Sequence, residues 1–358
     1  MKVLLLQVAD FFKQLIFRLF LLMIILTAIA YYFYFYKPSD TGVITGKIRD
    51  FRLNEISGLV VSEKNADTLW VHNDSGHDNI IYAISKRGNI REKFEINGID
   101  LRDIEDISIY KDDQGESYLI LSDLGSNTKM RTNSTPKLVF FKEPDLLVDL
   151  CELPSENSGQ TYQISQFEIY ELEFPDVPEI QYTDQNAFIN NIINNIENAT
   201  PDIEAIIVDT KQKELLFFSK TYKGITGIFS IPLDNLKSDG INKLSYEGSI
   251  NIKQFTEGYH IDFRHLLLSP INFPYAVTAA DLSRDQDTLL IRTYGNTWEW
   301  HRGYAQKSFS QIIQTTKPEY VMSAFEPLGE SIGIDLDSKG FYTISEGLFS
   351  KIYYNELP

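Results

Sequence analysis

The sequence predicts an all-β protein: a β-propeller of five or six blades that follows an N-terminal transmembrane helix. Three features support this fold class, namely an uncharged apolar run near the N-terminus, a repeated pair of short β-runs around a polar turn, and a composition rich in aromatic residues. Tyr and Phe account for 20 and 23 of the 358 residues, and aromatic side chains favour strands.

The apolar run covers residues 19–36 and carries no charge, which is long enough for a helix that crosses most of a bilayer. Lys2, Lys13 and Arg18 precede it, so the positive-inside rule predicts a cytoplasmic N-terminus. We therefore expect a single-pass protein of the cell membrane, with residues 1–18 in the cytoplasm, a signal anchor at 19–36, a linker at 37–41 and an extracytoplasmic domain at 42–358. Residues 28–30 (Ala-Ile-Ala) resemble a cleavage site, so a cleaved signal peptide is the alternative.

The hairpin pattern recurs five times along the chain, in residues 54–76, 103–127, 202–222, 278–296 and 329–347. Each copy has two short β-runs around a polar turn, as in an antiparallel hairpin. Repeats of about 40–50 residues built from short strands are typical of a β-propeller. A sixth blade has room in 128–200 or 223–277, so the pattern leaves five or six blades open.

Two further segments refine this prediction. The β-run in 42–51 precedes the first blade, and we expect it to pair with the last blade and close the ring. Phe188, Ile192 and Ile196 recur every four residues, which predicts a helical insertion near 185–200.

Composition excludes some classes of function. The chain has 33 basic and 50 acidic residues, a formal charge of −17, and such a surface repels phosphate backbones. We therefore expect no nucleic-acid partner. The single cysteine, Cys151, rules out an internal disulfide and cysteine-based metal motifs.

The hairpins place polar residues at the strand ends. In a hairpin the start of the first strand lies beside the end of the second, and in a propeller the first strands line the axis. The expected neighbours are Glu55 with Asn73 and Asp74, Glu105 and Asp106 with Asp123, Glu204 with Lys220, Asp281 with Arg292, and Glu330 with Glu346. All of these pairs should converge at one mouth of the central channel.

Converging carboxylates repel one another unless a cation is present, and an arc of hard oxygen ligands suits Ca²⁺. The predicted metal ligands are Glu55, Asn73, Asp74, Glu105, Asp106, Asp123 and Glu204. The predicted ligand-binding residues are His72, Lys220, Asp281, Arg292, Glu330 and Glu346. The alternative is that the carboxylates cap strands and turns through hydrogen bonds.

The assembled motifs resemble a family of largely uncharacterised extracytoplasmic β-propellers that is distantly similar to phytase-like and esterase-like propellers. The matching stretches include EISGL with LWVHNDSG, DIEDI with SDLGSN, DIEAIIVD with LLFFSK, TAADLS with LLIRTYGNTW, and GESIGI with FYTISEG. The chain departs from the family at Ile104, where Trp is usual, and at Ser126, where Asp is usual. The resemblance implies a propeller and no particular reaction.

The leading interpretation is a membrane-anchored extracytoplasmic propeller that binds a small molecule or protein at its channel mouth, with Ca²⁺. A metal-dependent hydrolase of the phosphoesterase or esterase type is the second hypothesis, with metal-activated water and with Lys220 and Arg292 clamping the substrate. A structural scaffold that uses the rims is the third. The sequence leaves open whether the protein is an enzyme, which ligand it binds, and its oligomeric state.

Overall fold

The computed structural model divides into two compact units, Met1–Asp40 and Thr41–Pro358. The residues that it describes are 18–20, 22–24, 27, 42–74, 76, 78–125, 135–147, 160–177, 201–221, 224–255, 274–304 and 306–358. Among these residues, no helix is both long enough and apolar enough to span a membrane. Most of the predicted anchor at 19–36, and all of the predicted helical insertion at 185–200, lie outside the described residues.

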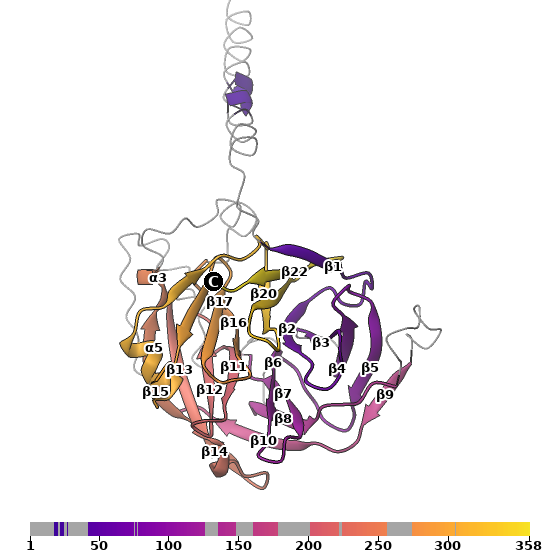
Figure 1. The fold of residues 1–358 in the computed structure, drawn as a ribbon, viewed down its shortest axis with the longest axis vertical. Helices are drawn as coiled ribbons and strands as arrows, with labels where there is room; N and C mark the ends of the chain where they lie inside the picture. The colour runs from indigo at the N-terminus through magenta and orange to yellow at the C-terminus, as the bar shows by residue number, and fades with distance from the viewer. Residues whose placement is uncertain are drawn as a thin grey trace, which may run out of the picture. The chain divides into compact units, whose positions relative to one another are not determined.

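The second unit is a ring of five β-sheets (Figure 1). We number these sheets as blades 1 to 5 in the order of their innermost strands. Blade 1 contains β2 (Ile56–Val61), β3 (Thr68–Asn73), β4 (Ile80–Ser85) and β5 (Ile90–Ile96). Blade 2 contains β6 (Ile104–Lys111), β7 (Ser117–Asp123), β8 (Lys137–Lys142) and β10 (Glu168–Glu173).

The other three blades repeat this order from the axis outward. Blade 3 contains β11 (Ile203–Asp209), β12 (Glu214–Ser219), β13 (Ile225–Pro232) and β15 (Ser245–Asn251). Blade 4 contains β16 (Val277–Leu282), β17 (Thr288–Thr293), β18 (Thr297–His301) and β19 (Glu319–Val321). Blade 5 contains β20 (Gly329–Ile334), β21 (Gly340–Ser345) and β22 (Lys351–Glu356), with β1 (Val43–Lys47) as its fourth strand.

The ring closes as the sequence predicts. Strand β1 comes first in the chain but pairs antiparallel with β22 of the last blade, with Val43 opposite Tyr354 and Lys47 opposite Lys351. This pairing ties the two ends of the domain together and covers a sheet edge. The number of blades is five, since the described strands of 135–177 and 224–255 belong to blades 1 to 3.

Two short strands cross between blades. Strand β9 (Thr161–Ile164) follows β8 of blade 2 but pairs in parallel with β5 of blade 1. Strand β14 (Ile241–Lys243) follows β13 of blade 3 but pairs in parallel with β10 of blade 2. Each adds a fifth strand to the outer edge of the preceding blade.

The hydrophobic core consists of five clusters, one between each pair of neighbouring blades. Along β7, for example, Leu119 and Leu121 pack against blade 1, whereas Ile120 between them packs against blade 3. Strands buried on both faces need apolar residues at consecutive positions, which explains runs such as LLFF in β12. Outside the sheets lie η2 (Leu233–Asn235), α3 (Ile252–Phe255) and α5 (Phe309–Thr315), and Ser308 caps the N-terminus of α5 through Gln311 N.

Candidate functional site

The mouth of the channel is built by a feature that all five innermost strands share. Each of these strands has a register shift at its start, where one residue bulges out of the ladder. A bulged residue is left unpaired, and its side chain is re-aimed. The bulged residues are Ser57, Glu105, Glu204, Thr278 and Glu330.

A second set of equivalent residues follows the second strand of each blade. Its backbone N–H groups donate to the carbonyl that precedes the innermost strand, at distances of 2.7–3.3 Å. The donor and acceptor pairs are Asp74 to Glu55, Gly125 to Asp103, Lys220 to Asp202, Tyr294 to Ala276, and Glu346 to Leu328. Glu55, Glu204 and Glu330 thus lie at or next to the starts of innermost strands that share this hydrogen-bond pattern, and their roles in binding stay predictions.

Carboxylates dominate the side of the mouth formed by blades 1 to 3. Oxygen atoms of Asp74, Asp103 and Glu105 lie within 4.8 Å of one another, and so do oxygen atoms of Glu105, Asp202 and Glu204. Glu105 belongs to both groups. A Ca²⁺ ion with bonds of about 2.4 Å can join oxygens separated by about twice that distance, so each group has the span of a Ca²⁺ site.

Burial makes this concentration of charge costly. It raises the pKa of Glu105 well above its usual value, and the negative charges of Glu204 and Asp74 raise it further. Burial also raises the pKa of Glu204, although Lys220 acts in the opposite direction. Oε2 of Glu204 is buried without a hydrogen-bond partner, an arrangement that a bound cation would satisfy. The donor set and this unpartnered oxygen fit a hard divalent cation.

Lys220, which follows β12 of blade 3, provides a positive charge next to these carboxylates. Its ammonium group lies 2.9 Å from Glu204 and 3.6 Å from Glu330, and 5.4 Å from the centre of the Tyr294 ring. The Tyr294 hydroxyl donates a hydrogen bond to Glu330. Burial and the neighbouring carboxylate of Glu330 raise the pKa of Glu346 to about 9, so Glu346 holds a proton at neutral pH.

Two predicted metal ligands, Asn73 and Asp123, make the strand-end hydrogen bonds of the alternative interpretation. Asn73 accepts from Glu55 N and donates 2.6 Å to Arg52 O. Asp123 accepts from Asp103 N at 2.9 Å. Glu55 lies one residue before β2, at the position that Asp103 and Asp202 occupy in blades 2 and 3.

Asp106 and Asp281 connect innermost strands to the next blade. Asp106 accepts from Ile107 N and from Ile206 N of blade 3, both at 2.8 Å. Asp281 accepts from Leu282 N at 2.9 Å and from Ile334 N of blade 5 at 2.7 Å. The side-chain oxygens of both residues thus accept hydrogen bonds from backbone N–H groups, and these bonds hold neighbouring blades in register.

The expected pairing of Asp281 with Arg292 is wrong, because the register of β16 and β17 places Arg292 opposite Ala279. The bulge at the start of β16 shifts this register by one residue. The Arg292 guanidinium is 3% exposed and donates to Ser331 O at 2.7 Å and to Glu326 at 2.5 Å. Its charge is therefore matched inside the protein.

His72 is also enclosed. Its ring lies against Gly58, where a Cβ atom would collide with Nε2, and Nδ1 lies 2.9 Å from the Asn73 carbonyl. Burial lowers the pKa of His72 to about 4, so the ring is neutral at physiological pH.

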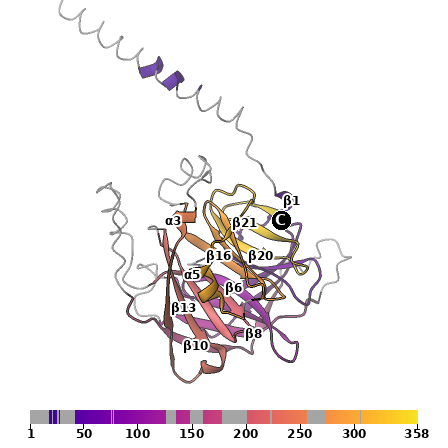
Figure 2. The same cartoon turned by 60° about the vertical axis from the view of Figure 1, so that its left-hand side comes forward.

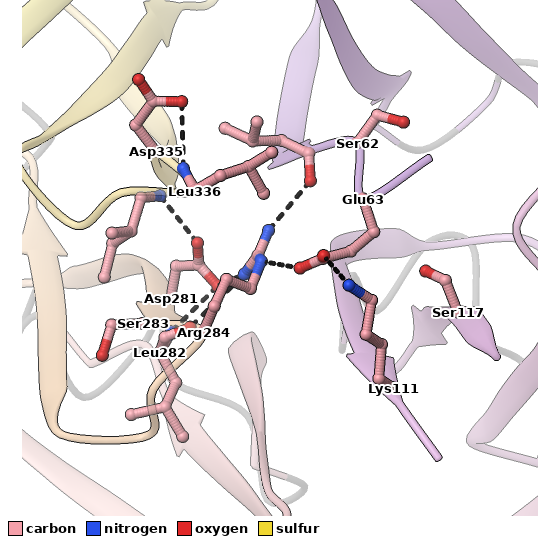
Figure 3. A network of polar contacts seen from close by, with 12 residues as sticks. Ser62, Glu63, Lys111, Ser117, Asp281, Leu282, Ser283, Arg284, Asp335 and Leu336 are labelled. Atoms are coloured by element: carbon pink, nitrogen blue, oxygen red, sulfur yellow. Dashed lines mark hydrogen bonds and ion pairs between the residues drawn. The ribbon is translucent and has the colours of Figure 1, made fainter. Parts of the chain in front are cut away.

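A network of charged side chains lies at the opposite ends of the innermost strands, and Figure 3 shows this network. Arg284 of blade 4 reaches across to blade 1, where it donates 2.9 Å to Val61 O and pairs with Glu63. Lys111 of blade 2 lies 2.7 Å from the other oxygen of Glu63. We call Glu63, Lys111 and Arg284 the channel floor.

Sequence reasoning missed three residues of the mouth: Asp103, Asp202 and Tyr294. The two aspartates precede an isoleucine at the strand start in RDIED and PDIEA, as Glu55 does in NEIS, and this shared pattern was the available signal. Tyr294 follows its strand as Lys220 and Asp74 do, but it is uncharged, and the prediction relied on charged residues at the strand ends.

Fold and site together define the chain as a five-bladed β-propeller with an acidic channel mouth and an ion-pair network at the opposite end. No protein-family model and no curated protein match it. Among solved structures, it is similar at 11% identity to the extracellular domain of a one component system, BT4673 from B. thetaiotaomicron, with a TM-score of 0.34 over 83% of this chain and 27% of that chain. It is also similar at 11% identity to the nidogen/laminin complex, with a TM-score of 0.38 over 81% of this chain and 72% of that chain. The present chain spans about a quarter of the first of these, and likeness at this level carries no functional argument.

Proposed function

We propose that this propeller is an extracytoplasmic, membrane-anchored binding protein whose channel mouth holds Ca²⁺ and, through it, a ligand or partner. The observation that carries the proposal is the pair of carboxylate groups that share Glu105, next to the unpartnered and buried Oε2 of Glu204. A cation there would replace the repulsion among these groups with coordination bonds.

The same geometry indicates which chemical group of a ligand would bind to the ion. Lys220 lies beside Glu204, on the side of the mouth that carries Tyr294 and Glu330. An anionic group of a ligand, such as a carboxylate or phosphate, would therefore meet the metal and the Lys220 ammonium together. The hydrolase hypothesis has less support, because its second clamp, Arg292, is engaged by Glu326 and Ser331 O.

Titration of the metal-free chain with Ca²⁺ tests the proposal by calorimetry and by thermal unfolding. At a free Ca²⁺ concentration of 100 times Kd, binding stabilises the folded state by about 2.7 kcal/mol. For a domain of this size, that raises Tm by roughly 5 °C. The absence of both binding heat and a rise in Tm would remove the proposal.

Variant Glu105→Gln locates the site, because Glu105 belongs to both carboxylate groups. It should abolish the response to Ca²⁺ while raising the stability of the metal-free chain, since one of the mutually repelling charges is gone. Glu116→Gln is the matched control: its carboxylate is partly exposed and lies 3.1 Å from the Lys142 ammonium, away from the mouth. This control should bind Ca²⁺ as the wild type does.

A further inference from the structure

The outer edges of blades 1 and 2 each carry an added short strand, and among the described residues the outer edge of blade 3 carries none. On β5 of blade 1 and on β10 of blade 2, a short strand adds in parallel, with four residue pairs for β9 and three for β14. Strand β15, the fourth strand of blade 3, is the outermost strand of its sheet among the described residues. The propeller itself therefore shows that this kind of edge accepts a parallel strand of three or four residues.

The pairing of β15 shows which of its backbone groups are free for such a strand. Ile225 lies opposite Asn251, and Ile252 N donates 2.8 Å to Gly224 O. In an antiparallel ladder this makes Asn251 a position without hydrogen bonds to its partner, and Ser249, two residues earlier, is another. The N–H and C=O groups of Ser249 and the N–H group of Asn251 therefore point away from β13, whereas the C=O group of Asn251 accepts the first hydrogen bond of α3.

A groove of about 510 Å³ lies along this edge. Ser249, Ile250 and Asn251 line one side, and residues 314–317, which comprise the end of α5 and the two residues after it, line the other. The buried side chains of Phe255 and Ile313 also line it. Figures 1 and 2 both place α3 and α5 next to blade 3.

Two side chains set the limits of the groove. Gln314 donates 3.1 Å to Glu247 O and packs against Gly248, so the free part of the edge starts at Ser249. Lys317 is the one charged residue among the described residues that line the groove, and it is exposed. An occupant that carries a carboxylate near this end would be favoured by charge complementarity.

We propose that this groove binds an extended acidic segment of a partner protein, which adds to β15 as a parallel fifth strand. The segment's main chain would bond to Ser249 and Asn251, one apolar side chain would contact Ile250, Phe255 and Ile313, and an acidic side chain would pair with Lys317. This site is independent of the metal proposed at the channel mouth.

The test uses the full-length chain and a displayed library of random nine-residue peptides as the probe, followed by synthesis of the selected sequence. We expect selected peptides to combine apolar and acidic residues. Their binding should fall at least tenfold in Ser249→Pro, which removes an N–H group that β13 does not use, and in Lys317→Glu. Lys339→Glu is the control, because Lys339 lies in an exposed turn of blade 5.

Hydrogen exchange gives a second measurement that does not depend on the proline variant folding. Peptide binding should slow exchange at the amides of Ser249 and Asn251, with a much smaller effect at Ile250, whose amide already faces β13. Binding should be the same with and without EDTA, which separates this site from the channel mouth.

Three results would overturn the proposal: selection of no peptide above background, equal binding to wild type and Ser249→Pro, or slowed exchange elsewhere. Sedimentation adds a fourth: a dimer of the free chain that Ser249→Pro dissociates would make a second copy the occupant.

Discussion

The stability of the metal-free chain should fall as pH rises from 6.5 to 8. The perturbation is the pH itself, and the group that carries the effect is Glu346, whose pKa is raised to about 9 by burial and by Glu330. In the unfolded chain the pKa of a glutamate is about 4.3. Across this pH range the folded state therefore keeps a proton that the unfolded state has lost.

The sign and size follow from proton linkage. Each extra proton bound by the folded state lowers the free energy of unfolding by about 1.4 kcal/mol per pH unit. Glu346 alone gives a loss of about 2 kcal/mol between pH 6.5 and 8. His72 acts in the opposite direction only below about pH 6.5, because its pKa is lowered to about 4.

Urea unfolding at pH 6.5, 7.25 and 8, followed by tryptophan fluorescence in the presence of EDTA, measures this slope. Variant Glu346→Gln should flatten it by about 1.4 kcal/mol per pH unit, since glutamine holds no titratable proton. A slope of zero or positive sign in the wild type would refute the reasoning. An unchanged slope in Glu346→Gln would show that the proton resides elsewhere.

Two further predictions concern the ring. Arg284→Met breaks the buried pair with Glu63 and should lower the free energy of unfolding by about 3 kcal/mol. The control Lys339→Met loses only an exposed pair with Asp337 and should lower it by less than about 1 kcal/mol. Equal losses in urea unfolding would argue against a stabilising role of the channel floor. Deleting residues 1–47 removes the ladder between β1 and β22 and should cost about 4 kcal/mol, at about 1 kcal/mol per backbone hydrogen bond, relative to a chain that begins at residue 41. Equal stability of these two chains would contradict closure by β1.

The fold was predictable because the hairpin pattern is local. Paired β-runs around a turn, repeated five times, predict the five blades that are observed while leaving room for a sixth, and the lone run in 42–51 predicts how they close. The exchanged strands β9 and β14 were not predictable. Their three- and four-residue pairings depend on the edges of β10 and β5, and nothing in TYQI or INK identifies those edges.

The candidate site was predictable as a location but less so residue by residue. Glu55 was aligned with Glu105 because both are the first glutamate of their repeats, yet the bulge places Ser57 at the position equivalent to Glu105. Asp281 was likewise grouped with the starting glutamates, but it lies three residues beyond Thr278, the bulged residue of its strand, and opposite Leu290. A bulge adds one residue to one strand, and in this chain the sequence pattern does not reveal it.

The residues of the channel floor were not predicted, for a different reason. Arg284 lies in the turn SRDQD, whose composition is that of a solvent-exposed hairpin turn. Its environment is created by the ring, which brings the turns of all five blades to one narrow opening. Arg284 reaches Val61 O on a blade that is not its sequence neighbour, and no local rule predicts such a contact.

The two ends of the channel therefore differ in how their charges are balanced. At the floor, the positive charges of Arg284 and Lys111 meet Glu63 within the protein. At the mouth, the carboxylates of Glu105 and Glu204 are buried close together, and the Lys220 ammonium group lies 2.9 Å from Glu204. A proton or a cation would reduce the repulsion between these buried carboxylates, so the stability of the ring and the occupancy of its mouth should be linked. Addition of Ca²⁺ should for this reason reduce the slope of the wild-type unfolding free energy against pH. A bound cation lowers the negative potential at the mouth, so Glu346 would lose its proton at a lower pH. An identical slope with and without Ca²⁺ would mean that ion and proton do not share this site.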